Sequence, residues 1–411
     1  MILNPYLKPR TLTAGLLSLG LLSSPVQAET PTPEDLWRVI QRQQRQIDDL
    51  KRKLDRTHDA VERTEEKVEA TGAALDRGAA ALPASASWTA RTRIGGYGEL
   101  HYNNLDSRKE LDFHRFVLFF GHDFTDRFHF DSEVEIEHVT TGEGAEEKGE
   151  VSIEQALLSY DLTARTSLLG GLYLVPVGIL NETHEPPTFY GVERNPVETF
   201  VIPTTWSEAG GGVRGRAPWG MNYEATVGSG LKTATTGANA YLIRPGRQSA
   251  SHASADNGAF TGRVRWTAVP GIELATTLQY QTDLTQGKGL PGTGADALLW
   301  EAHAIAARGP FALRALYARW DLFGAGPRAA GRDLQYGWYV EPSVRPHPKI
   351  GLFARYNEWD NGGTGANTWK WQANAGFNYW PIPNVVLKFD VQRQGGAVQD
   401  DGFNAGIGYQ F

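Results

Sequence analysis

Few histidine and carboxylate side chains in this 411-residue chain are spaced for catalysis. The segment His184-Glu185-Pro186-Pro187-Thr188 begins like the zinc-protease motif H-E-x-x-H, but that motif needs a helix and a second histidine, and two prolines and Thr188 occupy those places. No G-x-S-x-G motif occurs, and His303 beside Glu301 is better explained as a structural residue than as a catalytic base. The sequence predicts no catalytic residue, no metal site and no cofactor, so we do not expect an enzyme.

Composition removes further classes of function. The chain has no cysteine, which excludes thiol catalysis and cysteine-based metal sites, and its net charge of −7 argues against a nucleic-acid partner. Gly210, Gly212 and Gly215 match a dinucleotide-binding fingerprint by spacing, but no helix follows them, and we attribute the match to chance. Binding or transport is therefore more consistent with the chain than catalysis.

The remaining charged residues recur at every second position of segments with strand-like alternation. In the last segment Phe403, Ala405, Ile407, Tyr409 and Phe411 share one face, while polar residues and glycine share the other. Sixteen such segments of about ten residues follow one another from residue 93, and short and long connections alternate between them, as in bacterial membrane barrels. Aromatic residues near strand ends, among them Trp219, Trp300 and Trp320, are expected at the membrane interfaces. The sequence predicts an all-β fold, a 16-stranded antiparallel transmembrane β-barrel, and a soluble β-sandwich is the weaker alternative.

The polar face of such a barrel is its lumen, because the apolar face must meet lipid. A barrel of this size leaves an aqueous lumen, so transport is the expected function. The basic residues predicted to line it are Arg214, Arg216, Arg263, Arg265, Arg314, Arg345, Arg355 and Lys388. The acidic residues predicted to line it are Glu99, Asp131, Glu133, Glu135, Glu137, Glu224, Glu273, Glu301 and Glu341. These charges could create a field that orients solutes, or they could simply pair with each other and keep the lumen wet.

The longest connection, residues 177–206, is expected to fold into the barrel as a constriction. Loops of this length are usually functional, and the apolar content of this one, including Phe189, Phe200 and Trp206, suggests that it packs against the wall. The charged residues predicted at the narrowest point are Glu182, His184, Glu185, Glu193, Arg194 and Glu198.

The amino-terminal part is expected to be organised differently from the barrel. Residues 1–28, with Lys8, Arg10, an apolar stretch and small residues before Ala28, predict a secretory signal peptide. In residues 29–78, Ile40, Ile47 and further apolar residues recur every seven positions, which predicts a short periplasmic coiled coil rather than one amphipathic helix packed on the protein. Residues 79–91 are expected to form a flexible linker, and residues 92–411 the barrel.

Several motifs resemble the phosphate-selective porin O and P superfamily. They are Phe124-Thr125-Asp126-Arg127-Phe128-His129-Phe130, Glu154-Gln155-Ala156, Val175-Pro176 and His184-Glu185-Pro186-Pro187-Thr188. The chain is similar to a branch with an amino-terminal coiled coil, and the resemblance implies a trimeric, sixteen-stranded porin whose third loop folds inward. The third loop here has four glutamates against Arg194 alone, so the resemblance carries over the architecture and not the phosphate substrate.

The leading hypothesis is a porin of the bacterial outer membrane that passes small hydrophilic solutes. Its expected partners are outer-membrane lipid, two further copies in a homotrimer, and the barrel-assembly machinery, for which Tyr409 and Phe411 would form the terminal signal. The alternative is an envelope-spacing protein that acts through its coiled coil, and a barrel-embedded hydrolase is a weaker possibility. The sequence leaves the solute and the sign of the ion selectivity open.

Overall fold

The computed structural model describes residues 88–138, 149–289, 291–364 and 367–411. The predicted signal peptide and coiled coil, and most of the predicted linker, lie outside these residues. Residues 88–91, at the end of the predicted linker, form the 3-10 turn η1 (Trp88–Arg91). Among the described residues, no helix has the length and apolar content required to cross a membrane.

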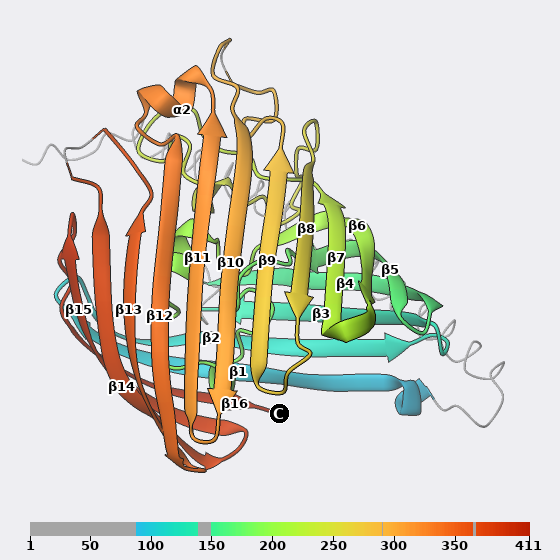
Figure 1. Cartoon of the computed structure of the whole chain (residues 1–411), viewed down its shortest axis with the longest axis vertical. Coiled ribbons are helices and arrows are strands. Elements are labelled where there is room, and N and C mark those ends of the chain that lie inside the picture. Colours follow the sequence, from blue (N-terminus) through green and yellow to red (C-terminus); the bar gives the residue numbers. More distant parts are fainter. Residues whose placement is uncertain (1–87, 139–148, 290, 365–366) are drawn as a thin grey trace, which may run out of the picture. The chain divides into compact units, whose positions relative to one another are not determined.

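The described part of the chain contains sixteen antiparallel strands, which close into one barrel (Figure 1). The strands are β1 (Thr92–Leu105), β2 (Lys109–Asp123), β3 (Phe128–Glu137), β4 (Glu150–Thr163), β5 (Thr166–Leu174), β6 (Ser207–Arg216), β7 (Met221–Gly228), β8 (Ala259–Trp266), β9 (Ile272–Gln281), β10 (Asp296–Arg308), β11 (Phe311–Phe323), β12 (Leu334–His347), β13 (Ile350–Asp360), β14 (Lys370–Ile382), β15 (Val385–Gly396) and β16 (Gly402–Gln410). Each strand pairs with its neighbours in sequence, and β1 pairs with β16. The sixteen-stranded closed barrel predicted from the sequence is confirmed.

The seam between the first and last strands closes through backbone hydrogen bonds. Tyr97 pairs with Gln410, and Leu105 with Gly402, at the two ends of the β1–β16 register. Beyond β16, the Gly96 and Phe411 backbones exchange two hydrogen bonds of 3.0 and 2.9 Å. A closed sheet has no free edge, and this satisfies the backbone groups of the strands.

Alternation along the strands separates an exposed apolar face from a buried polar one. In β15 Leu387 and Val391 are 38% and 50% exposed, whereas Lys388, Asp390 and Gln392 are at most 5% exposed. This is the reverse of a soluble protein, in which apolar side chains fill the interior. The wall therefore presents its apolar side chains outward and encloses its charges.

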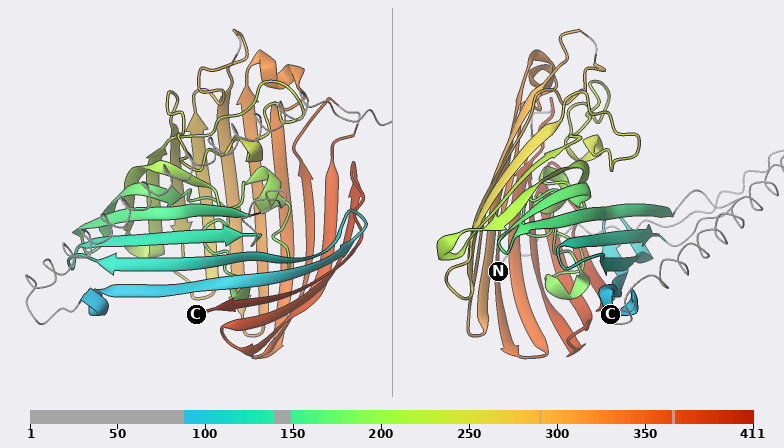
Figure 2. Two further views of the ribbon diagram at one scale, coloured as in Figure 1. Left: turned by 180° about the vertical axis from the view of Figure 1, so that it is seen from behind. Right: turned by 90° about the vertical axis from the view of Figure 1, so that its right-hand side faces the viewer.

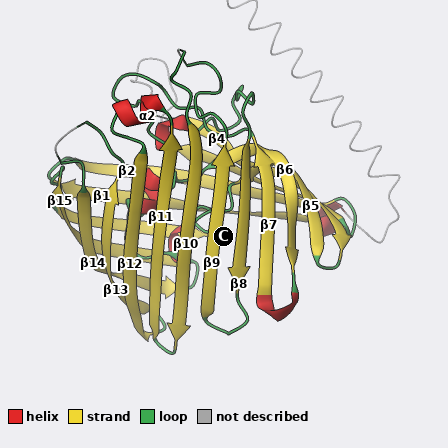
Figure 3. Ribbon diagram, turned by 45° about the horizontal axis from the view of Figure 1, so that its top comes forward, coloured by secondary structure: helices red, strands yellow, loops and turns green. Residues whose placement is uncertain are grey.

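The two ends of the barrel differ in their connections. Short turns join the strands at one end, and long loops and the helix α2 (Ala325–Ala329) lie at the other (Figure 3). Seen from behind, strands β1 to β5 form the blue-to-green part of the wall (Figure 2). At the long-loop end two connections are nevertheless short: residues 106–108 join β1 to β2, and residues 397–401 join β15 to β16.

Candidate functional site

The connection between β5 and β6, residues 175–206 and here called L3, is closed at its base by one amide side chain. The Asn181 Nδ2 atom donates hydrogen bonds to the carbonyls of Val175 (2.8 Å) and Trp206 (3.1 Å). The Trp206 backbone N–H donates back to Asn181 Oδ1 at 2.8 Å. An asparagine can make all of these bonds at once, so Asn181 holds the first and last residues of L3 together.

A buried carboxylate organises the middle of L3. Glu198 lies in η3 (Val197–Val201), a single π-helical turn, and is 2% exposed. Its Oε2 accepts hydrogen bonds from the backbone N–H groups of Ile179 (2.7 Å) and Leu180 (2.6 Å), and its Oε1 accepts one from the Tyr339 hydroxyl of β12 (2.7 Å). Glu198 therefore fixes the fold of L3 and joins it to the wall.

L3 contacts the polar face of strands spread around the barrel. The wall side chains Asn378, Trp320, Arg314 and Arg355 donate hydrogen bonds to L3 carbonyls, and Asp390 accepts one from the Val192 N–H. These wall residues come from β11, β13, β14 and β15. Trp320, which the sequence placed at a membrane interface, is instead fully buried against L3, because position 320 shares the polar face of β11.

Ion pairs attach L3 to the remaining side of the wall. Glu182 pairs with Arg263 of β8, whose guanidinium also lies 3.1 Å from Glu224 of β7. The Nε2 atom of His184 lies 3.2 Å from Glu133 of β3 and 3.4 Å from Glu154 of β4. Together with the hydrogen bonds above, these pairs tie L3 to eight strands.

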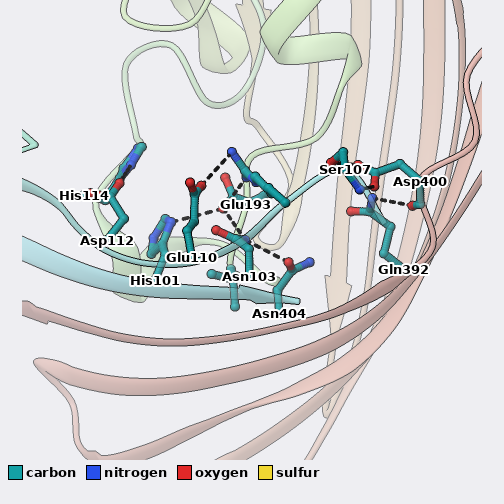
Figure 4. A network of polar contacts seen from close by, with 12 residues as sticks. His101, Asn103, Ser107, Glu110, Asp112, His114, Glu193, Gln392, Asp400 and Asn404 are labelled. Atoms are coloured by element: carbon teal, nitrogen blue, oxygen red, sulfur yellow. Dashed lines mark hydrogen bonds and ion pairs between the residues drawn. The ribbon is translucent and has the colours of Figure 1, made fainter. Parts of the chain in front are cut away.

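A third group of contacts joins L3 to β1 (Figure 4). The Glu193 Oε1 atom accepts a hydrogen bond of 2.9 Å from Asn103 Nδ2 and lies 3.2 Å from both His101 Nδ1 and Arg108 Nη2. Asn103 in turn donates to Asn404 of β16 at 2.8 Å. Glu193 is thus an anchor beside the barrel seam.

A cavity of about 760 Å³ lies beside L3, and charged side chains of both signs line it. Those of β3 and β4 are acidic, whereas L3 and the connection between β7 and β8 contribute three arginines, Arg194, Arg244 and Arg247. The acidic lining side chains are Glu99, Glu135, Glu137, Glu150, Glu154, Glu193 and Asp400, and the basic ones are Arg108, Arg115, Arg194, Arg244, Arg247 and Lys370. A solute in this cavity would meet the field of both sets of charges.

Three of these basic residues, Arg194, Arg244 and Arg247, have no ion pair among the described residues. Arg108 and Arg115, in contrast, pair with glutamates of the lining. Arg244 donates to the Thr199 carbonyl at 3.0 Å and packs over the Phe200 ring, and Arg247 donates to the Thr204 carbonyl. Burial, with the neighbouring Arg247 and Arg194 guanidiniums, lowers the pKa of Arg244 to about 10, so it stays charged at neutral pH. Burial also lowers the pKa of Arg247, against the opposing effect of the carboxylates Glu137, Glu154, Glu135 and Glu150.

A second cavity of about 310 Å³ lies among the ends of β4 to β8 near the short turns. Arg214 pairs in register with Glu224, and Glu224 with Arg263, while Arg216 and Arg265 flank Asn222. Arginine outnumbers carboxylate in this cavity. Its lining charged residues are Arg165, Arg214, Arg216, Arg263, Arg265, Asp161 and Glu224.

The other predicted wall residues are mostly paired. Glu341 lies 3.1 Å from Arg355 and 4.0 Å from Arg314, and His303 lies between Glu301 (2.7 Å) and Glu273 (3.2 Å). Four further predicted positions remain. Asp131 pairs with the exposed Arg93, and the Nζ atom of Lys388 lies 3.4 Å from the centre of the Phe189 ring. Arg345 packs over Trp380 near a short turn, and Glu185 is a half-buried residue that precedes η2 (Pro186–Thr188).

Sequence reasoning missed three arginines. Arg115 of β2 is 2% exposed and lies between Glu99 (2.5 Å) and Glu135 (3.3 Å). Its strand is apolar on both faces from Phe116 to Phe120, so alternation gave no inward face. Arg244 and Arg247 lie in a loop, where no alternation of residues indicates which way a side chain faces.

Comparison with known proteins supports the fold. An anion-selective porin from Comamonas acidovorans matches with a TM-score of 0.55 and 12% identity, over 78% of this chain and 99% of that chain. The outer membrane channel DcaP of Acinetobacter baumannii matches with a TM-score of 0.51 and 12% identity, over 78% and 97% of the two chains. OmpT, an outer membrane protein of Vibrio cholerae in its trimer form, matches with a TM-score of 0.51 and 10% identity, over 78% and 99%. At these identities the likeness establishes a shared barrel fold.

Sequence comparison adds one relative. An uncharacterized protein of Aquifex aeolicus (strain VF5) is 38% identical over 247 residues, which are 59% of this chain and 53% of that protein. The chain therefore spans about half the length of this curated relative. No protein-family model matches the sequence.

Proposed function

We propose that this protein is a porin of the bacterial outer membrane, through which small hydrophilic solutes, including ions, diffuse passively. The observation that carries the proposal is the pairing of an apolar outer face with a lumen in which L3 is fixed beside a charged cavity of about 760 Å³. The porins and channels that share the fold support it. No step of this function needs a catalytic group.

In this proposal L3 is the constriction. Its bonds to strands around the barrel hold it in place, and its fixed geometry would give the pore a constant cross-section. Solutes would pass the acidic side chains of β3 and β4 and the arginines Arg194, Arg244 and Arg247, which line the same cavity, so size and charge would both select them. Membership of the phosphate-selective porin O and P superfamily, carried over for its architecture and not for its phosphate substrate, remains a prediction, as do the coiled coil and the absence of enzymatic activity.

A homotrimer is part of the proposal. A trimer form of the structurally similar OmpT supports it, together with the predicted coiled coil at the amino terminus. Mass determination of the full chain in detergent gives the number of copies directly, and a monomer would contradict this part while leaving the single-barrel channel intact.

Bilayer recording tests the central claim. Purified, folded protein should produce stepwise conductance in a planar bilayer, and heat-denatured protein from the same preparation should produce none. Folded oligomer that inserts without any conductance would show that the lumen is closed and that the proposal is wrong.

A further inference from the structure

A bulge in β2 brings polar side chains together near the outer end of the barrel. In the β1–β2 register Glu99 pairs with Arg115 and His101 pairs with Asp112, so Phe113 and His114 both face the single residue Leu100. An extra residue in one strand re-aims the side chains that follow it. As a result His114 joins Arg115 in lining the larger cavity, while Phe113 is 37% exposed on the outer face.

His138 completes the group from the end of β3. Its backbone N–H donates to the His114 carbonyl at 3.1 Å, and its φ of 48° lies in the left-handed region that residues other than glycine seldom adopt. In this conformation its Nδ1 lies 3.0 and 2.9 Å from the two carboxylate oxygens of Asp112. The His114 Nδ1 lies 3.1 Å from Asp112 Oδ2 (Figure 4).

These three side chains offer the donors that a transition metal prefers. Two imidazole nitrogens and one carboxylate oxygen lie within 4.8 Å of one another. Zinc binds such atoms at about 2.0–2.2 Å, which places tetrahedral ligands roughly 3.4 Å apart. The observed separations of 2.9 to 3.1 Å need to widen by only a few tenths of an ångström to admit the ion. Imidazole ligands favour zinc, nickel or copper over magnesium and calcium.

Access and charge also suit a cation. The side chains of Asp112, His114 and His138 are 23%, 29% and 45% exposed, so an ion can reach them from solvent and keep water as further ligands. The carboxylates of Glu110 and Glu137 are close enough to act on His138. Two neighbouring arginines are themselves paired with glutamates: Arg108 with Glu110 and Glu193, and Arg115 with Glu99 and Glu135.

We propose that Asp112, His114 and His138 form a binding site for one divalent transition-metal ion, with Zn²⁺ as its representative, at the mouth of the larger cavity. Another group, Glu133, Glu154 and His184, has comparable spacing but is fully buried, and the Arg194 guanidinium acts on its histidine. A cation there would have to compete with this guanidinium and bind side chains that are at most 5% exposed. The structure therefore favours the site formed by Asp112, His114 and His138.

The test is a Zn²⁺ titration of the full-length, tag-free protein in detergent after stripping with EDTA, followed by isothermal calorimetry. We expect one site per chain, an affinity at least about tenfold weaker in Asp112→Asn and in His138→Ala, and no saturable site in the His114→Ala/His138→Ala double variant. His252→Ala, which removes an exposed histidine from the loop between β7 and β8, is the matched control and should bind as the parent does.

Folding of each variant is checked by its shift in gel mobility on heating, and the isosteric Asp112→Asn variant tests the site even if a histidine variant misfolds. The proposal fails if the parent protein binds no stoichiometric Zn²⁺. It also fails if folded Asp112→Asn and the folded double variant bind Zn²⁺ unchanged, including the case in which His184→Ala abolishes binding and so assigns it to the buried group.

Discussion

Replacing Arg244 and Arg247 by glutamine should shift the ion preference of the channel toward cations. Both guanidiniums line the larger cavity, and neither pairs with a described carboxylate, so their charge is available to a passing ion. Glutamine keeps an amide that can still donate to the Thr199 and Thr204 carbonyls. The direction of the shift does not depend on whether the parent channel prefers anions or cations.

The size of the shift follows from the charge and the cavity. A unit charge about 7 Å from an ion in water contributes about 0.6 kcal/mol. Screening in 0.1 M salt, where the Debye length is about 10 Å, roughly halves this value. Two charges therefore change the energy of a cation by about 0.6 to 1.2 kcal/mol, and that of an anion by the same amount with the opposite sign. The difference of about 1.2 to 2.4 kcal/mol corresponds to a change of about seven- to fiftyfold in the ratio of cation to anion permeability.

Reversal potentials across a tenfold KCl gradient, with 0.1 M on the dilute side, measure this ratio. Arg244→Lys/Arg247→Lys keeps the charge and should behave as the parent does. Arg328→Gln removes a charge from α2, outside the cavity, and should also leave the ratio unchanged. Across a gradient with about 1 M KCl on the dilute side and about 3 M on the other, the charge effect should largely vanish, because the Debye length falls to about 3 Å or less. The reasoning is refuted if the glutamine pair changes the ratio less than twofold at low salt, or if the lysine pair changes it equally.

Three further predictions concern the stability of the barrel and its loop. Arg115→Gln leaves Glu99 and Glu135 buried without their arginine partner and should lower the unfolding free energy, measured by urea titration, by about 3–5 kcal/mol. The control Arg93→Gln, which breaks an exposed ion pair, should lower it by at most about 1 kcal/mol. Equal losses in the two variants would contradict this reasoning. Asn181→Ala should open the base of L3 and destabilise its closed conformation by about 1–3 kcal/mol. The change should be seen as faster proteolysis within residues 175–206 and as noisier single-channel currents. Asn222→Ala, near a short turn, serves as the control. Deleting Phe411 removes two backbone hydrogen bonds of the seam together with the predicted terminal signal, and it should lower the amount of assembled barrel in the membrane. Phe411→Ala keeps the backbone and should lower this amount less. Unchanged membrane levels for the deletion would count against the role of this residue.

The strands could be predicted because alternation has a physical cause that the sequence records directly. Lys388, Asp390 and Gln392 alternate with Leu387 and Val391, and the structure places the two sets on opposite faces of β15. A closed barrel then follows from the number of strands and the absence of any free edge. The short turns and the sixteen-stranded closure needed no information beyond this local pattern.

The bulge in β2 shows where local pattern fails. A strict period of two would place Phe113 and Arg115 on the same face and His114 on the other. One inserted residue reverses this relation, and only the β1–β2 register reveals it. The same limit applies to Arg244 and Arg247, whose direction depends on contacts with L3 rather than on any repeat.

The inward charges divide into two kinds once their partners are known. Glu198, Arg263 and Arg355 are buried and bonded between wall and loop, and a buried charge without such a partner would be costly, so these residues chiefly hold L3 in place. Arg194 and Arg244 face the larger cavity without an ion pair among the described residues, and the Nη2 atom of Arg194 also lacks any hydrogen-bond partner there. Selectivity should depend on this second kind, because a charge already neutralised by its partner contributes little field to a passing solute. The number of charged residues in the wall is therefore a poor guide to ion preference, and the few unpaired ones beside L3 are the positions at which substitution should change it.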